Sequence, residues 1–120
     1  MIDQEEDITM MQQANLIIGG TGLSMGYSVY VFRQAIRLNL TGLIRNVDDG
    51  KVRIVCEGEK EAIEEFRRAI RIKDELTEVT DIKIDYGEAG GCYDTFLVAL
   101  DLRYNGSQMH DWAKISIFPG

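Results

Sequence analysis

The stretch LNLTGLIRNVDDGKVRIVCEGEKEAIEEFRRAI, from Leu38 to Ile70, contains the clearest local structure in the chain. Two strand-like runs, 43–47 and 51–57, flank Asp48-Asp49-Gly50, and an Asp-Gly pair between such runs is typical of a β-hairpin. Val52, Ile54 and Cys56 alternate with Arg53, Val55 and Glu57. We expect the first set to face the core, so that Cys56 is a small buried apolar residue and not a nucleophile.

A helix is predicted directly after the hairpin, over 59–73. Its apolar residues recur at spacings of three and four and would form one buried face: Ala62, Ile63, Phe66, Ala69 and Ile70. This spacing is typical of an amphipathic helix. Glu64 and Arg68, four residues apart, fall on another face, where we interpret the charges as solvated.

Upstream of the hairpin, the sequence GGTGLSMGYS runs from Gly19 to Ser28 after an apolar segment. Residues 14–19 are predicted to form a short buried strand and residues 29–38 a helix. Glycine-rich sequence between a strand and a helix can present several backbone N–H groups to an anion at the helix N-terminus. A plain tight turn is the alternative interpretation of these glycines.

Downstream, strands are predicted over 81–86 and 93–104 from their alternating apolar residues, with a loop over 88–91. Asn105-Gly106 is a type I′ turn signal, so residues 112–118 could return as a further strand. The order is β-α-β-β-α-β with a C-terminal strand extension. We therefore predict an α+β, ferredoxin-like domain over 14–120, with two helices on one face of an antiparallel sheet, preceded by an acidic mobile tail over 1–13.

Composition and charge exclude several kinds of partner and site for this protein. The 120 residues have a net charge of −7, which argues against a nucleic-acid or anionic-membrane partner. No apolar run is long enough for a membrane span, and the first residues lack a secretion signal, so a cytoplasmic location is expected. Two widely spaced cysteines and a single histidine predict no disulfide and no metal site, and we expect no cofactor. Residues 14–56 carry five basic and two acidic residues, which suits a small anionic ligand.

A dinucleotide-binding interpretation of the glycines fails on context, because the acidic residues that follow lie in a hairpin turn and not after a parallel strand. Residues 38–70 instead resemble the acylphosphatase family, whose pattern is G-L-x-G-x-V-R-N-x-x-D-G-x-V followed by E-G and a helix. The matching positions are Leu40, Gly42, Arg45, Asn46, Asp49, Gly50, Val52, Glu57 and Gly58. The spacing to the glycine segment also fits without gaps.

The resemblance implies hydrolysis of acyl phosphates, with loop amides and an arginine holding the phosphate and an asparagine orienting the attacking water. Asn46 matches that asparagine, although an asparagine near a turn can also serve a purely structural role. Ser28 occupies the arginine position, where its hydroxyl carries no charge. The implied ligand-binding residues are Gly22, Leu23, Ser24, Met25, Gly26 and Tyr27. We therefore expect a small phosphorylated or anionic ligand and weak or lost hydrolysis.

An alternative from another class is a non-catalytic ligand-binding or protein-interaction module. It would use the anion site for a phosphorylated ligand, or pair its C-terminal strand with a protein partner. Tyr104, Trp112 and Phe118 would then be aromatic anchors, or else core and strand-pair residues.

Overall fold

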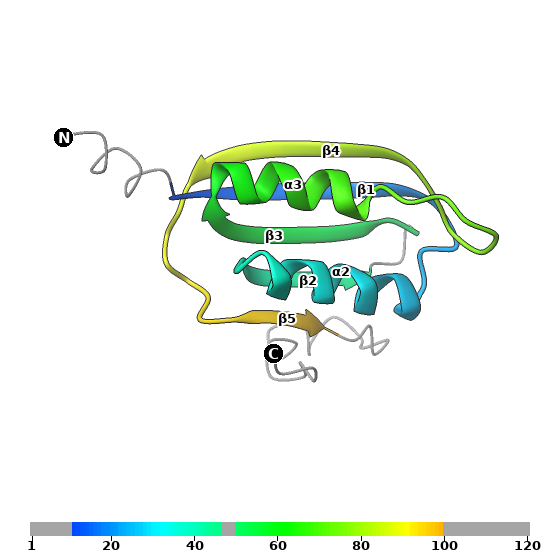
Figure 1. Ribbon diagram of the computed structural model, residues 1–120, viewed down its shortest axis with the longest axis horizontal. Helices are drawn as coiled ribbons and strands as arrows, with labels where there is room; N and C mark the ends of the chain where they lie inside the picture. Colours follow the sequence, from blue (N-terminus) through cyan, green and yellow to red (C-terminus); the bar gives the residue numbers. More distant parts are fainter. Residues whose placement is uncertain (1–10, 47–49, 100–120) are drawn as a thin grey trace, which may run out of the picture.

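The computed structural model describes residues 11–46 and 50–99 of the chain. In chain order the elements are β1 (Met11–Thr21), α2 (Met25–Arg37), β2 (Thr41–Asn46), β3 (Val52–Glu59), α3 (Lys60–Ile70), β4 (Glu78–Glu88) and β5 (Phe96–Ala99). Both helices lie on one face of a five-stranded sheet (Figure 1). The predicted ferredoxin-like arrangement is confirmed.

The strand order in the sheet is β4-β1-β3-β2-β5. The first four strands are antiparallel to their neighbours, as predicted, but β5 is parallel to β2, so the sheet is mixed. The reason is geometric. Because β4 runs opposite to β2, the last residues of β4 lie at the same end of the sheet as the first residues of β2. From there the chain crosses the sheet and forms β5 beside β2, in the same direction as β2.

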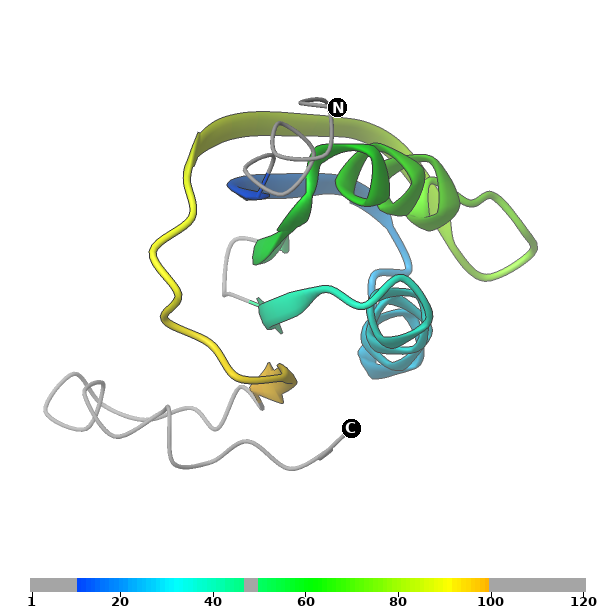
Figure 2. The same ribbon diagram turned by 60° about the vertical axis from the view of Figure 1, so that its left-hand side comes forward.

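That connection, residues 89–95, passes the sheet on the side away from the helices (Figure 2). It reaches across β1, β3 and β2 to join the two outer strands, β4 and β5. We call it the crossover. The predicted strand over 93–104 therefore begins later than expected, at Phe96, because the residues before it belong to the crossover.

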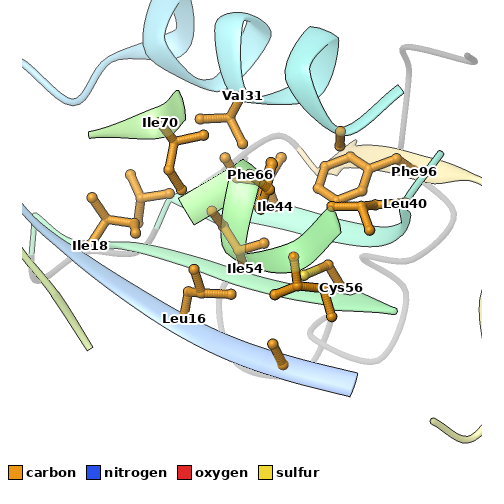
Figure 3. Packing of buried hydrophobic residues seen from close by; sticks show 14 of the residues in the cluster. Leu16, Ile18, Val31, Leu40, Ile44, Ile54, Cys56, Phe66, Ile70 and Phe96 are labelled. Carbon is orange, nitrogen blue, oxygen red and sulfur yellow. The ribbon is translucent and has the colours of Figure 1, made fainter. Parts of the chain in front are cut away.

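The core lies between the sheet and the helices (Figure 3). Alternate residues of β1 and β3 point into it, and Val52, Ile54 and Cys56 are all buried, as the alternation predicts. Phe66 of α3 packs edge-on against Phe96 of β5, with the ring centroids 6.2 Å apart. The predicted burial of Cys56 is thus confirmed, and burial raises the pKa of its thiol to about 12.

The element boundaries differ from the predictions at several ends. The helix predicted over 59–73 spans Lys60–Ile70, because residues 71–77 instead form a turn that closes with an isolated bridge between Lys73 and Glu78. The strand predicted over 81–86 is longer, Glu78–Glu88, since it pairs with β1 along almost its whole length. Glu57 was expected on an exposed face, but its side chain is buried.

Several predictions lie outside the described residues. These are residues 1–10 of the tail predicted over 1–13, the turn residues Asp48 and Asp49, the Asn105-Gly106 turn, the strand over 112–118 and the three C-terminal aromatic residues. Residues 11–13 of the predicted tail are instead the start of β1, because they pair with neighbouring strands of the sheet. Within the described ranges, no helix has both the length and the apolar character needed to cross a membrane.

Candidate functional site

The glycine segment is shorter as a loop than predicted. Gly19 and Gly20 belong to β1, which continues to Thr21 and pairs with β4 across a bulge between the two glycines. A Cβ atom on Gly20 would lie 2.1 Å from the carbonyl oxygen of Glu78. Gly20 therefore allows the β4 backbone to approach β1 closely, a recognised role of glycine in strands.

The loop itself consists of residues 22–24 and is fixed by contacts at Gly22. This residue has a φ of +70°, and a Cβ atom there would lie 1.8 Å from the carbonyl oxygen of Leu76. Its own carbonyl accepts hydrogen bonds from the Ser24 amide, at 2.9 Å, and from the Thr77 hydroxyl, at 3.1 Å. Only glycine combines this backbone conformation with so close a neighbour.

Helix α2 begins at Met25, four residues earlier than predicted. Ser24 is the N-cap residue, without a side-chain capping bond, and its carbonyl accepts from the Ser28 amide at 3.1 Å. The amides of Ser24 and Ser28 are thus already engaged. Helix geometry leaves the N–H groups of Met25, Gly26 and Tyr27 without intrahelical acceptors. Ser24 therefore does not offer its amide to an anion as predicted, whereas the three amides of the first helical turn remain available.

Ser28 and Asn46 meet below this turn. The Ser28 hydroxyl, only 1% exposed as a residue, donates to Asn46 Oδ1 at 2.9 Å. Asn46 Nδ2 in turn donates to the carbonyl oxygen of Leu23 at 2.9 Å. Ser28 does not cap the helix, because it lies within it. The two residues that the resemblance singled out are therefore in direct contact, and they connect the loop, the helix and the end of β2.

The first turn of α2 is also fastened to the end of α3. The Tyr27 hydroxyl donates to the carbonyl oxygen of Ile70 at 2.8 Å, and the Tyr30 hydroxyl donates to that of Ala69 at 2.6 Å. Burial raises the pKa of Tyr27, together with a smaller effect of the neighbouring Tyr30. Tyr27, predicted as a ligand-binding residue, contributes its amide to the turn while its side chain is structural.

Thr77 is a contact that the sequence did not reveal. It approaches the loop because residues 74–77 form a tight turn, in which Asp74 Oδ1 accepts from the amides of Leu76 and Thr77, both at 2.9 Å. Asp-x-x-Thr is a recognisable turn signal. Nothing in the sequence, however, indicates that this turn would pack on a glycine 55 residues earlier.

Arg45, next to Asn46 in the chain, faces the opposite side of the sheet, as strand alternation predicts. It lines a hollow there together with Arg53 and Tyr93. The first turn of α2 contains no acidic residue, which favours a negatively charged ligand electrostatically. Among the described residues, no group of His, Cys, Asp and Glu side chains could hold a metal ion.

Comparison with known proteins places the chain in a family. The acylphosphatase family profile matches residues 15–98, more than half of the chain. An acylphosphatase of Bacillus licheniformis is 36% identical over 75 residues, which cover 62% of this chain and 83% of the relative. One from Bacillus velezensis is 30% identical over 89 residues, covering 74% and 99%.

The crystal structure of acylphosphatase from Bacillus subtilis superimposes with a TM-score of 0.66 at 28% identity. The superposition covers 71% of this chain and 94% of that one. The chain belongs to the acylphosphatase family.

Proposed function

We propose that this protein binds a small phosphorylated or otherwise anionic ligand at the first turn of α2 and hydrolyses acyl phosphates slowly or not at all. The observation that carries this proposal is the hydrogen-bonded chain from Ser28 through Asn46 to Leu23. It holds the Asn46 amide beside the turn whose backbone N–H groups lack intrahelical acceptors. Partially positive N–H groups at a helix N-terminus favour phosphate oxygens.

The reaction of an acyl phosphate with water develops negative charge on the phosphoryl oxygens, which fixed N–H groups stabilise without rearrangement. After its two bonds, Asn46 retains one Nδ2 hydrogen and one Oδ1 lone pair. These groups are sufficient to hold a water molecule, in keeping with the role implied by family resemblance.

The expected weakness in hydrolysis follows from Ser28. By family resemblance this position would carry an arginine, whose guanidinium neutralises phosphoryl charge through two parallel hydrogen bonds. The Ser28 hydroxyl is neutral, and it is already donated to Asn46. The absence of one strong donor to the transition state typically reduces kcat by about 10²–10³.

Hydrolysis of benzoyl phosphate by the full chain tests the proposal, with Ser28→Arg as the informative variant. We expect the arginine to raise kcat by roughly hundredfold. Thr21→Arg is the matched control, since it adds the same charge at an exposed position next to the loop and should leave the rate unchanged. A wild-type rate equal to that of Ser28→Arg would contradict the proposed loss of activity.

Because arginine at a buried position could disturb folding, binding is measured on the unaltered chain as well. Inorganic phosphate should shift the backbone amide resonances of Met25, Gly26 and Tyr27 in a saturable manner. The absence of shifts there would refute the anion site, whatever the result with the variant.

The alternative function, a protein-interaction module, would use the edge of the sheet. In the described part of the chain, β5 is the outer strand beside β2, and β-strand addition at such an edge is a common mode of recognition. The phosphate titration separates the two functions. Shifts confined to the loop and the first turn favour the ligand site, and their complete absence favours the partner.

A further inference from the structure

The hollow beside Arg45 and Arg53 lies on the face of the sheet away from the helices and is therefore distinct from the site at α2. Its volume is about 310 Å³, which is in the range of small-molecule sites. Ile17 of β1, Val55 of β3 and Leu43 of β2 contribute to its lining, and all three belong to the strand positions that alternate with the core residues. They give the hollow an apolar floor.

Two arginines lie side by side at one end of this floor. Arg45 of β2 and Arg53 of β3 are paired directly across the antiparallel ladder, and both line the hollow. Cβ atoms of such pairs are about 5 Å apart, and like charges at this separation destabilise a sheet. An anion between the two guanidinium groups would interact favourably with both of them. Both side chains have other interactions, but a guanidinium has five N–H donors and can bind an anion in addition.

The crossover contributes Tyr93 to the lining of the hollow. The position of the crossover is set by Glu57, whose carboxylate accepts hydrogen bonds from the amides of Gly90 and Gly91 at 2.9 and 3.1 Å. Glu57 lies four residues from Arg53 along β3, or about 13 Å at the usual rise of a strand. Its carboxylate therefore binds the crossover amides, at a distance from the arginine pair.

We propose that this hollow binds a small organic anion with an apolar, preferably aromatic body. Its carboxylate or phosphate group would lie between Arg45 and Arg53, and its body would lie on the apolar floor beside Tyr93. Paired guanidinium groups match the two oxygens of either head group, and aromatic rings pack well against a tyrosine. This site does not depend on the function proposed for α2, since Asn46 and Arg45 face opposite sides of the sheet.

The test is an NMR titration of the full chain with benzoate and with phenyl phosphate, using inorganic phosphate as a probe that lacks the apolar body. We expect both aromatic anions to shift the amides of Arg53, Val55 and Tyr93, and inorganic phosphate to saturate these shifts more weakly. Arg53→Gln should weaken the binding of both by roughly tenfold, as expected for loss of a hydrogen bond between charged groups. Arg33→Gln, an exposed arginine on α2, is the matched control and should have no effect.

Three results would overturn the proposal. The first is no shift at these amides at about 10 mM ligand, a concentration that reveals even weak binding. The second is an equal affinity in Arg53→Gln and the unaltered chain. The third is a set of shifts confined to residues 22–28, which would assign both aromatic anions to the site at α2. A higher affinity for either head group supports the site and identifies the group that it prefers.

Discussion

Replacement of Glu57 by glutamine tests how the crossover is held to the sheet. Glu57 Oε2 accepts hydrogen bonds from Gln13 Nε2 at 3.0 Å and from the Gly90 amide at 2.9 Å, and Oε1 accepts from the Gly91 amide at 3.1 Å. The carboxylate thus has three donors distributed over both oxygens. Glutamine has the same shape but only one acceptor oxygen, so at least one donor would face an NH₂ group.

The loss can be estimated from these bonds. A hydrogen bond to a charged group contributes about 1.5–3 kcal/mol net. Gly90 and Gly91 are exposed, so water can replace part of the hydrogen bonding that their amides lose in the variant. In addition, the energies of several hydrogen bonds to one carboxylate are not additive. We expect Glu57→Gln to lower the free energy of unfolding by about 2 kcal/mol at pH 7. The urea midpoint, followed by circular dichroism, should fall by about 1 M.

The effect should depend on pH in a defined direction. Burial by itself would raise the pKa of Glu57, but the hydrogen bonds from Gly90, Gln13 and Gly91 outweigh it, and the pKa lies below its ordinary value of 4.5. A carboxyl with a lowered pKa stabilises the fold above the unfolded pKa and loses that contribution as the pH falls through the folded one. The difference between the two proteins should therefore be complete at neutral pH and shrink below pH 4.5.

Glu88→Gln, which makes the same charge change at an exposed end of β4, is the control and should be neutral. In Glu57→Gln, the amides of Gly90 and Gly91 should also exchange with solvent faster than in the unaltered chain. Equal urea midpoints at pH 7, together with unchanged amide exchange, would refute the view that Glu57 fastens the crossover.

Two further predictions concern the loop and the thiols. Gly22→Ala should lower the free energy of unfolding, measured by urea denaturation, by about 2–3 kcal/mol, because the new Cβ atom combines a positive φ with a clash at Leu76. Gly50→Ala is the comparison. Its φ of +82° is also positive, but the space around it is open, so the loss should be only about 1 kcal/mol. Equal losses would show that the close contact is unimportant. A thiol reagent such as dithionitrobenzoate should modify the exposed Cys92 rapidly and the buried Cys56 only after unfolding, because burial raises the pKa of the Cys56 thiol. Equal rates of modification for the two thiols would show that Cys56 is not buried.

The parts of the fold that could be predicted are those specified by neighbouring residues. The hairpin strands β2 and β3, the helix α3 and the burial of Cys56 all follow from apolar spacing within a single element. Such patterns are local, so they are present in the sequence whatever the rest of the chain does. The order of elements then leaves few ways to bury both helices against one sheet.

What the sequence did not reveal depends on contacts between distant segments. Gly20 lies in a strand because β4 approaches it, and Glu57 is buried because the crossover covers it. The parallel pairing of β5 with β2 is likewise set by where β4 ends. None of these partners is near in sequence, so propensity and periodicity contain no information about them.

The candidate site was predicted in part. Family resemblance singled out Ser28 and Asn46, and the structure brings them within 2.9 Å of each other. The sequence could not show that Ser28 lies inside α2, since its position at the end of the glycine-rich segment 19–28 favoured a loop there. Nor could it show that Thr77 supports the loop at Gly22, because that contact exists only once α3 and its following turn are in place.

The first of the described strands, β1, is an interior strand of the sheet, flanked by β3 and β4. During synthesis on the ribosome, its backbone groups have no strand partner until residues 52–59 have emerged on one side and residues 78–88 on the other. A nascent chain that ends before β4 would therefore expose an open edge of its longest apolar strand, which favours non-native association. The strand β1 is thus paired on both sides only when nearly all of the sheet-forming sequence has been translated.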